Sequence, residues 1–317
     1  MTALTPARIT LRLHRFEIVA LTLLTALGVI ATLVVAARLD AVGFGSHCNE
    51  AMRVGTAVPA DCEFKMNQFY EIVYQAGTVS AFSIIAPFVA ALLLGVAVVG
   101  REIERGTTRL AWALTSSRLR WFFQRFLPVL LVVGAGAYVL GIAADRLLAA
   151  TEPGLDPANA FAKFGWRGAI LAARVAFVLA LAVLVGAVMG RALPALIVAG
   201  LLAGAAITGG TLVHGKILES EAVVIEDGQV GDHYIDQMFR LPDGRYVGWD
   251  EIEQYDPPPT EAEMIDGVEW PTMPQVTFGV PGSRYREVEL REVGALAGGS
   301  LVALLITAVV IQRRRPG

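Results

Sequence analysis

Six apolar segments of about 20 residues constrain the fold of this chain more than any other feature. A helix of that length, rising about 1.5 Å per residue, crosses the roughly 30 Å hydrocarbon core of a bilayer. The chain is 55% hydrophobic and only 17% charged, which makes it more apolar than a typical soluble domain. We therefore expect an all-α polytopic membrane protein with six transmembrane helices. The segments lie at about 18–37, 77–99, 127–147, 168–189, 193–213 and 293–311.

Charged residues are divided unequally between the stretches that connect these spans. Four stretches together carry 13 Lys or Arg and three acidic residues, and they lie at 1–17, 101–125, 190–192 and 312–317. The long stretch 214–292 instead holds 18 of the 29 acidic residues. Because basic connectors stay on the inner side of a membrane, we expect both termini and 101–125 to be cytoplasmic, in a bacterial plasma membrane. The first apolar segment is long for a signal peptide, so we expect it to be retained as a span.

The stretch between spans five and six is long enough for a small domain. Two of its sequences, IEDGQV (225–230) and LPDGRYV (241–247), place Asp-Gly turns between β-forming residues and predict hairpins. We expect three parts along the chain. They are a transmembrane domain with spans one to five at 1–213, a small β-containing extracytoplasmic domain at 214–292, and the sixth span with a basic cytoplasmic tail at 293–317.

Both cysteines of the chain, Cys48 and Cys62, lie in the connector between the first two spans. If this connector faces an oxidising compartment, the two can form a disulfide; the alternative is a pair of free thiols. His47 precedes Cys48, and these two side chains supply two metal ligands at most. We therefore expect no metal site.

The patterns of common catalytic and nucleotide-binding sites are incomplete or absent. GTLVHGKI (210–217) fits G-x-x-x-x-G-K, but Ile217 stands where a phosphate loop needs Ser or Thr to hold Mg²⁺. No G-x-S-x-G nucleophile motif occurs. Ionisable residues within the spans are few, Arg174 among them, which argues against an ion-coupled carrier. We expect no catalytic residue and no cofactor in this chain.

The most polar stretch between two spans is GREIERGTTRLAWALTSSRLRW (100–121). On a helical wheel, residues 101–115 form two stripes and predict one amphipathic helix with its polar face toward the cytosol. Gly106 either bends the chain there or lets another surface approach closely. Ser116 and Ser117 can cap the following helix. The first stripe is Ile103, Thr107, Leu110 and Leu114, and the second is Arg101, Arg105, Arg109 and Trp112.

This stretch resembles the connector between the second and third spans in membrane subunits of ATP-binding-cassette exporters of the type-2 permease family, notably actinobacterial members. The number of spans and the long loop before the last span resemble the same family. The residues that carry the resemblance are Arg101, Glu102, Glu104, Gly106, Thr107, Leu110, Ala111, Trp112, Ser117, Arg118, Arg120 and Trp121.

The resemblance implies that 101–115 is a coupling helix on which a separate ATPase subunit docks. ATP and Mg²⁺ would be bound by that partner, present in two copies, while two permease copies form the pathway as a homodimer or heterodimer. It also implies that the second and fifth spans line the central cavity. The coupling residues are then Glu102, Glu104, Gly106, Thr107, Arg109, Trp112 and Arg118. The lining residues are Gln75, Thr78, Ser80, Ser83 and Thr208.

Two local alternatives stay open at this point. The lining hydroxyls can bond to carbonyls of their own helix, and Glu102 can pair with Arg105 within the helix. The function that we expect is a permease subunit that exports a hydrophobic or amphipathic compound, such as a drug, lipid or peptide. Its partners are the ATPase, a second permease copy and lipid, with no nucleic acid. The alternative is a membrane-anchored binding or signalling protein that acts through its extracytoplasmic domain.

Overall fold

The computed structural model describes residues 15–54, 57–115, 117–225, 231–258 and 270–314. These described residues form a mostly helical fold, and six of their helices are long and apolar enough to cross a membrane, as predicted. Each predicted span lies within one of them. The helices are α2 (Arg15–Val42), α4 (Ala60–Glu104), α6 (Arg118–Thr151), α7 (Gly168–Met189), α8 (Ala192–Ser220) and α10 (Tyr285–Arg313).

The chain divides into two compact units. The first, which we call the membrane unit, contains the described residues up to 155, residues 163–209 and those from 287 on. The second, the sheet unit, contains 156–162 and 210–286. The predicted domain boundaries at 214 and 292 stay a prediction.

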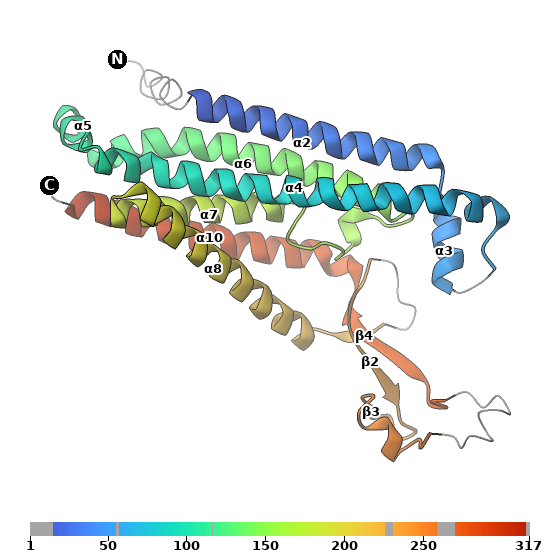
Figure 1. The fold of residues 1–317 in the computed structure, drawn as a ribbon. Coiled ribbons are helices and arrows are strands. Elements are labelled where there is room, and N and C mark those ends of the chain that lie inside the picture. The colour runs from blue at the N-terminus through green and yellow to red at the C-terminus, as the bar shows by residue number, and fades with distance from the viewer. Residues whose placement is uncertain (1–14, 55–56, 116, 226–230, 259–269, 315–317) are drawn as a thin grey trace. The chain divides into compact units, whose positions relative to one another are not determined.

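The membrane unit is built around α4, α6 and α7. Figure 1 shows α2, α4 and α6 running side by side, and buried aliphatic and aromatic side chains from α4, α6 and α7 form the main core. The helices α4 and α7 approach closely at glycines. A Cβ on Gly95 would lie 2.7 Å from the Cβ of Ala182, and one on Gly186 would lie 3.1 Å from the carbonyl oxygen of Val96. A larger side chain at these positions would force the two helices apart.

The sheet unit contains a four-stranded antiparallel sheet in the order β1-β4-β2-β3. The hairpin predicted at LPDGRYV is present, because β2 and β3 pair through Phe239 and Val247. The hairpin predicted at IEDGQV is wrong in its pairing, because β4 lies between β1 and β2; residues 226–230 are outside the described chain. The strands are β1 (Val223–Ile225), β2 (His233–Arg240), β3 (Tyr246–Val247) and β4 (Gln275–Val280).

The β2–β3 turn is fixed by local hydrogen bonds. The backbone N–H of Arg245 donates to Asp243 Oδ1 at 3.0 Å, and the Arg245 guanidinium donates to Oδ2 at 2.8 Å. These bonds to the charged carboxylate lower the pKa of Asp243. Four buried side chains, Phe239, Leu241, Val247 and Ile252, form the small core beside this turn.

The connector between α2 and α4 contains a further helix, α3 (Ser46–Val54). Cys48 on α3 and Cys62 in the first turn of α4 are joined by a disulfide in the structure. Phe44 and Phe69 stack beside it with ring centroids 4.4 Å apart. Formation of this bridge in the cell stays a prediction.

Candidate functional site

Residues 101–115 contain the end of one helix and the whole of a second, and not a single helix. α4 ends at Glu104, residues 105–107 form a turn, and α5 (Thr108–Leu114) follows. Gly106 has a φ of +70°, which ends a helix and is strained for any residue with a Cβ. Its N–H bonds back to the carbonyl of Ile103 at 3.1 Å. The single helix predicted over 101–115 is therefore wrong.

The predicted faces of α5 are also wrong, because the turn at Gly106 changes the direction of the chain. Leu110, which we placed on the apolar stripe, is 68% exposed. Trp112, which we placed on the polar stripe, is half-buried. Thr107 is exposed and its hydroxyl donates to the carbonyl of Glu102 at 3.2 Å. The side chains of Arg109 and Leu114 lie outside the described residues, as does Ser116.

Five side chains join α5 to α4 and α6, and we call them the Trp–Arg cluster: Glu102, Trp112, Arg118, Trp121 and Arg125. The Arg118 guanidinium lies over the Trp112 ring at 4.6 Å. The two tryptophan rings meet edge to face at 6.0 Å. The Arg125 guanidinium lies over Trp121 at 4.9 Å and forms an ion pair with Glu102.

The Trp–Arg cluster is held by ring and charge contacts. Both indole N–H groups are buried without a hydrogen-bond partner among the described residues. Each cation–π contact contributes about 0.5–2 kcal/mol and the ring pair about 0.5–1.5 kcal/mol. Glu102 forms its ion pair with Arg125, 23 residues further along the chain. The pairing with Arg105 within the helix, which the sequence left open, is not the one observed. Arg118 therefore attaches α5 to the beginning of α6, and Arg125 attaches α6 to the end of α4.

Arg118 also binds the end of α10. Its Nη1 donates to the carbonyl oxygens of Gln312 at 3.0 Å and of Arg314 at 2.8 Å. Arg314 in turn donates to the carbonyls of Ala187 and Val188 at the end of α7. Arginines at helix C-termini are stabilised by the carbonyls left free there. The ends of α7 and α10 are thus connected to the Trp–Arg cluster.

Glu104, predicted to face an ATPase, caps another helix of the same chain. Its Oε2 accepts a hydrogen bond of 3.0 Å from the N–H of Ala192, the first residue of α8. A carboxylate at a helix N-terminus is favourable because the free N–H groups carry partial positive charge. Ser117 acts in the same way at α6, accepting from the N–H of Arg120. The end of α4 is therefore attached to the beginning of α8.

A cavity of about 490 Å³ lies among α4, α7 and α8. Its volume and apolar lining are typical of sites for small apolar or amphipathic ligands. Of the predicted lining residues only Thr208 is part of its wall. The lining residues are Ala81, Ile84, Ile85, Phe88, Leu92, Trp166, Val178, Gly200, Ala203, Gly204, Ile207 and Thr208.

The other predicted lining residues lie elsewhere on α4. Gln75 accepts a hydrogen bond of 3.0 Å from Arg38 of α2. The Ser83 hydroxyl lies 3.3 Å from that of Thr32, also on α2. Thr78 is exposed and Ser80 is half-buried, and neither belongs to the wall of this cavity. From the sequence we chose polar side chains as candidate lining residues, whereas the observed lining is mainly apolar.

One wall residue connects the cavity to a buried ion pair. Trp166 meets Phe88 edge to face at 6.0 Å, and the Arg174 guanidinium lies 5.3 Å from the Trp166 ring centroid. Arg174 Nη2 and Glu292 Oε1 are 2.5 Å apart, and their side chains are only 5% and 14% exposed. The sequence identified Arg174 as an ionisable residue in a span but did not find its partner, which lies 118 positions away.

The described geometry offers no phosphate loop at the G-x-x-x-x-G-K sequence. Residues 210–217 lie within the regular helix α8 and not in a loop. A phosphate-binding loop needs backbone N–H groups free to point at the phosphate, which an intact helix does not supply. This agrees with the missing hydroxyl at Ile217.

A protein-family model described as ABC-2 membrane transporter related matches residues 18–213, more than half of the chain. The chain belongs to this family. As a member of the ABC-2 membrane transporter related family, it is a multi-pass membrane protein and a non-catalytic permease component of an ABC transporter. Membership implies that it works with an ABC ATPase subunit. Searches of curated proteins and of solved structures find no match.

The ABC-2 match covers most of the candidate site. It begins in α2, includes α4 to α7, and ends within α8. The whole Trp–Arg cluster and the cavity wall lie inside the matched range. Arg314, Glu292 and strands β1 to β4 lie outside it. The family match does not include α10, so the contacts of α10 with residues 18–213 are given by the structure and not by the family match.

Gly106 should be needed for the backbone angle of the turn before α5. A Cβ at this position would have no atom within 4 Å, so close contact within the described chain does not require glycine. Replacement by alanine should still destabilise the turn by about 1–2 kcal/mol, because L-residues are disfavoured at positive φ. Hydrogen exchange of amides 105–115 should become about five- to thirtyfold faster in Gly106→Ala.

Gly134→Ala is the matched control for this substitution. Gly134 lies inside α6, has no positive φ, and also has open space around its Cβ position. Alanine should be neutral or slightly stabilising there. Equal exchange of α5 in Gly106→Ala and wild type would show that the turn does not depend on glycine.

Proposed function

We propose that this chain forms the substrate pathway of an ATP-driven exporter and that α5 is the surface on which the ATPase subunit docks. Two permease copies, as a homodimer or a heterodimer, and two ATPase subunits make the complete transporter. ATP and Mg²⁺ are bound by the ATPase, and this chain converts its movement into a change of the pathway. The attachment of α5 to α4, α6, α8 and α10 through the Trp–Arg cluster and Glu104 is the observation that supports this proposal.

A docking helix must satisfy two physical requirements. It needs an exposed surface for its partner, and it needs contacts that carry a displacement to the spans. Leu110 supplies exposed apolar surface, and apolar side chains at the centre of an interface contribute much of its affinity. The Trp–Arg cluster supplies the second requirement, since Trp112 connects α5 to α6, and Arg118 connects α6 to α10.

The coupling residues predicted from the sequence divide into two roles in this proposal. Glu102, Glu104, Trp112 and Arg118 act within the chain, because each has its contact on another helix of the same copy. The exposed residues of the turn and of α5 face the partner, Thr107 and Leu110 among them. An ATPase that moves α5 would then move α4, α6, α8 and α10 together.

The cavity among α4, α7 and α8 favours an apolar or amphipathic cargo. Ile84, Ile85, Leu92, Val178 and Ile207 supply aliphatic surface, and Trp166 and Thr208 add the polar N–H and hydroxyl groups of their side chains. A simple ion would find few ligands in such a wall, whereas a drug-sized or lipid-like molecule would bury apolar surface there.

The orientation in the membrane follows from charge. Figure 1 shows α5, the beginning of α2 and the end of α10 at one end of the bundle. The described parts of the basic stretches 101–125 and 312–317 lie at this end, and we propose that it is cytoplasmic, with both termini on the same side. The acidic stretch 214–292 then lies outside the cell.

Leu110→Glu should weaken binding of the ATPase subunit by about tenfold or more, because a charge would replace an apolar group in the interface. Affinity is measured with purified ATPase and with this chain in nanodiscs, and transport-coupled ATP hydrolysis should fall in parallel. Insertion and thermal stability should stay near wild type, since Leu110 is exposed.

Leu290→Glu is the matched control. Leu290 is 71% exposed on α10, close to the 68% of Leu110, but it lies near the beginning of that helix, far along the chain from α5. It should leave ATPase binding within about twofold of wild type. Equal binding by wild type and Leu110→Glu would contradict docking at α5, and full transport without any ATPase would contradict the proposed function.

A further inference from the structure

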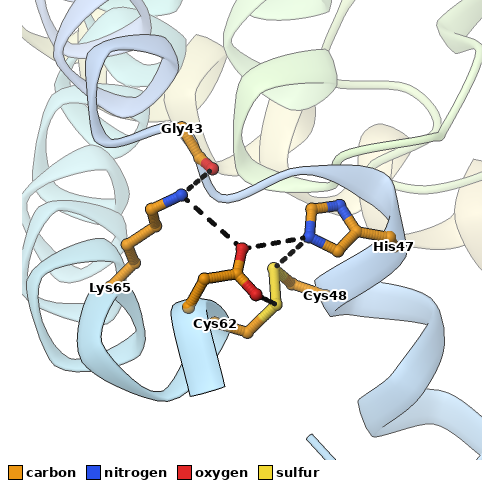
Figure 2. A network of polar contacts seen from close by, with 6 residues as sticks. Gly43, His47, Cys48, Cys62 and Lys65 are labelled. Carbon is orange, nitrogen blue, oxygen red and sulfur yellow. Dashed lines mark hydrogen bonds and ion pairs between the residues drawn. A yellow bond between two sulfur atoms is a disulfide. The ribbon is translucent and has the colours of Figure 1, made fainter. Parts of the chain in front are cut away.

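Four ligand-type side chains meet where α3 and α4 begin. His47 and Cys48 lie in the first turn of α3, and Asp61 and Cys62 lie in the first turn of α4. One ligand atom from each lies within 4.8 Å of the others. Figure 2 shows His47 and the two cysteines side by side, with Lys65 approaching from α4. The sequence suggested two ligands at most, because Asp61 and Cys62 come next to His47 only in the folded hairpin.

Two separations between these atoms fit a tetrahedral zinc site. Usual Zn–S, Zn–N and Zn–O bond lengths require ligand atoms to be about 3.3–3.8 Å apart around the metal. His47 Nε2 lies 3.4 Å from Asp61 Oδ2 and 3.3 Å from Cys48 Sγ. Cys62 Sγ lies 3.9 Å from the other carboxylate oxygen, Asp61 Oδ1, slightly beyond this range. The two sulfur atoms are bonded to each other, so the bond must be reduced before both can bind a metal.

Charge also favours a dication once the sulfurs are free. Two thiolates and one carboxylate would carry three negative charges, which Zn²⁺ and the Lys65 ammonium would neutralise. Lys65 Nζ lies 3.8 Å from Asp61 Oδ2 and is fixed by the carbonyl of Gly43 at 3.2 Å. Both cysteines are in N-terminal helical turns, where free backbone N–H groups stabilise negative charge.

We propose that the Cys48–Cys62 hairpin is a zinc site when its disulfide is reduced. His47 Nε2, Asp61 and the two thiolates are the ligands, so the hairpin is closed by a covalent bond when oxidised and by the metal when reduced. The cysteines are fully buried, whereas the side chains of His47 and Asp61 are 59% and 55% exposed. The metal therefore enters from the side of His47 and Asp61.

The chemical step balances with a phosphine as the reductant. The phosphine and one water convert the disulfide to two thiols, and the phosphine becomes a phosphine oxide. Zn²⁺ then displaces the two thiol protons and forms two Zn–S bonds. A thiol–disulfide exchange partner can perform the first step instead, becoming oxidised to its own disulfide.

The test uses the full chain in detergent or nanodiscs. One sample stays oxidised, and a second is reduced with a phosphine and desalted without oxygen; both are titrated with Zn²⁺ against a chromophoric chelator. The reduced protein should bind about one Zn²⁺ per chain, at least about 100-fold more tightly than the oxidised protein. Co²⁺ in place of Zn²⁺ should give a thiolate-to-cobalt charge-transfer band only in the reduced sample.

Variants separate a four-ligand site from binding by thiols alone. His47→Ala and Asp61→Asn should each weaken Zn²⁺ binding of the reduced chain by about tenfold or more, and His233→Ala in the sheet unit should not. The proposal is overturned by reduced wild type that does not bind Zn²⁺ tightly, or by equal binding of oxidised and reduced wild type. Equal affinity of the His47→Ala and wild-type proteins would also overturn it. The comparison of Zn²⁺ binding by oxidised and reduced wild type uses no variant, so it remains a test even if a variant does not fold.

Discussion

Trp112→Ala should lower transport and transport-coupled ATP hydrolysis by about tenfold or more while the chain still inserts and binds its ATPase. Trp112 contacts both Arg118 and Trp121, so its ring packs α5 against α6. Losing these contacts removes about 1–3 kcal/mol of attachment, and tenfold in rate corresponds to about 1.4 kcal/mol. The ATPase would then move α5 without moving the spans.

Two further variants make this prediction specific. Trp112→Phe keeps a ring and should recover much of the coupling, whereas Tyr138→Ala, which removes an exposed aromatic ring of α6, should have little effect. Of these three variants, only Trp112→Ala should show faster amide hydrogen exchange in α5. If Trp112→Ala shows faster hydrogen exchange in α5 but wild-type transport-coupled ATP hydrolysis, the Trp–Arg cluster does not transmit movement.

Glu292→Leu should destabilise the membrane unit by about 3–5 kcal/mol, because it leaves the Arg174 guanidinium buried without its carboxylate. The pair joins α7 to α10 through hydrogen bonds of 2.9 Å and 2.5 Å. The double variant Arg174→Leu with Glu292→Leu removes both charges and should recover most of the lost stability. Thermal unfolding of the detergent-solubilised chain measures the effect.

An exposed ion pair is the control for this experiment. Lys216 and Glu219 on α8 are 2.7 Å apart, but their side chains are 79% and 48% exposed. Glu219→Leu should change stability by less than about 1 kcal/mol, since water screens such pairs. A double variant at 174 and 292 that is no more stable than Glu292→Leu alone would mean that burial of the unpaired charge is not the cause.

The spans could be predicted from the sequence because one local property, about 20 consecutive apolar residues, decides them. The β2–β3 hairpin could be predicted for a similar reason, since its Asp-Gly turn is local. The family resemblance of residues 101–121 was also local, and the ABC-2 family match supports it.

The roles of single residues could not be predicted in this way, because their partners are distant in sequence. Glu102 meets Arg125, and Glu104 meets the N–H of Ala192, only after α4, α6 and α8 have packed together. A helical wheel assumes one uninterrupted helix, so the positive φ of Gly106 invalidated the faces assigned beyond it. The same limit applies to Asp61, which the folded hairpin places beside His47.

The central claim is that α5 faces the cytoplasm and is covered by the ATPase, and a single cysteine at position 110 tests it most directly. In the structure the two native cysteines are joined in a disulfide, and where this bond is formed Leu110→Cys supplies the one free thiol of the chain. A membrane-impermeant maleimide should label it in inverted membrane vesicles and not in intact cells, and purified ATPase subunit should protect it from the label. Labelling from outside intact cells, or labelling in inverted vesicles that the ATPase does not reduce, would contradict the account.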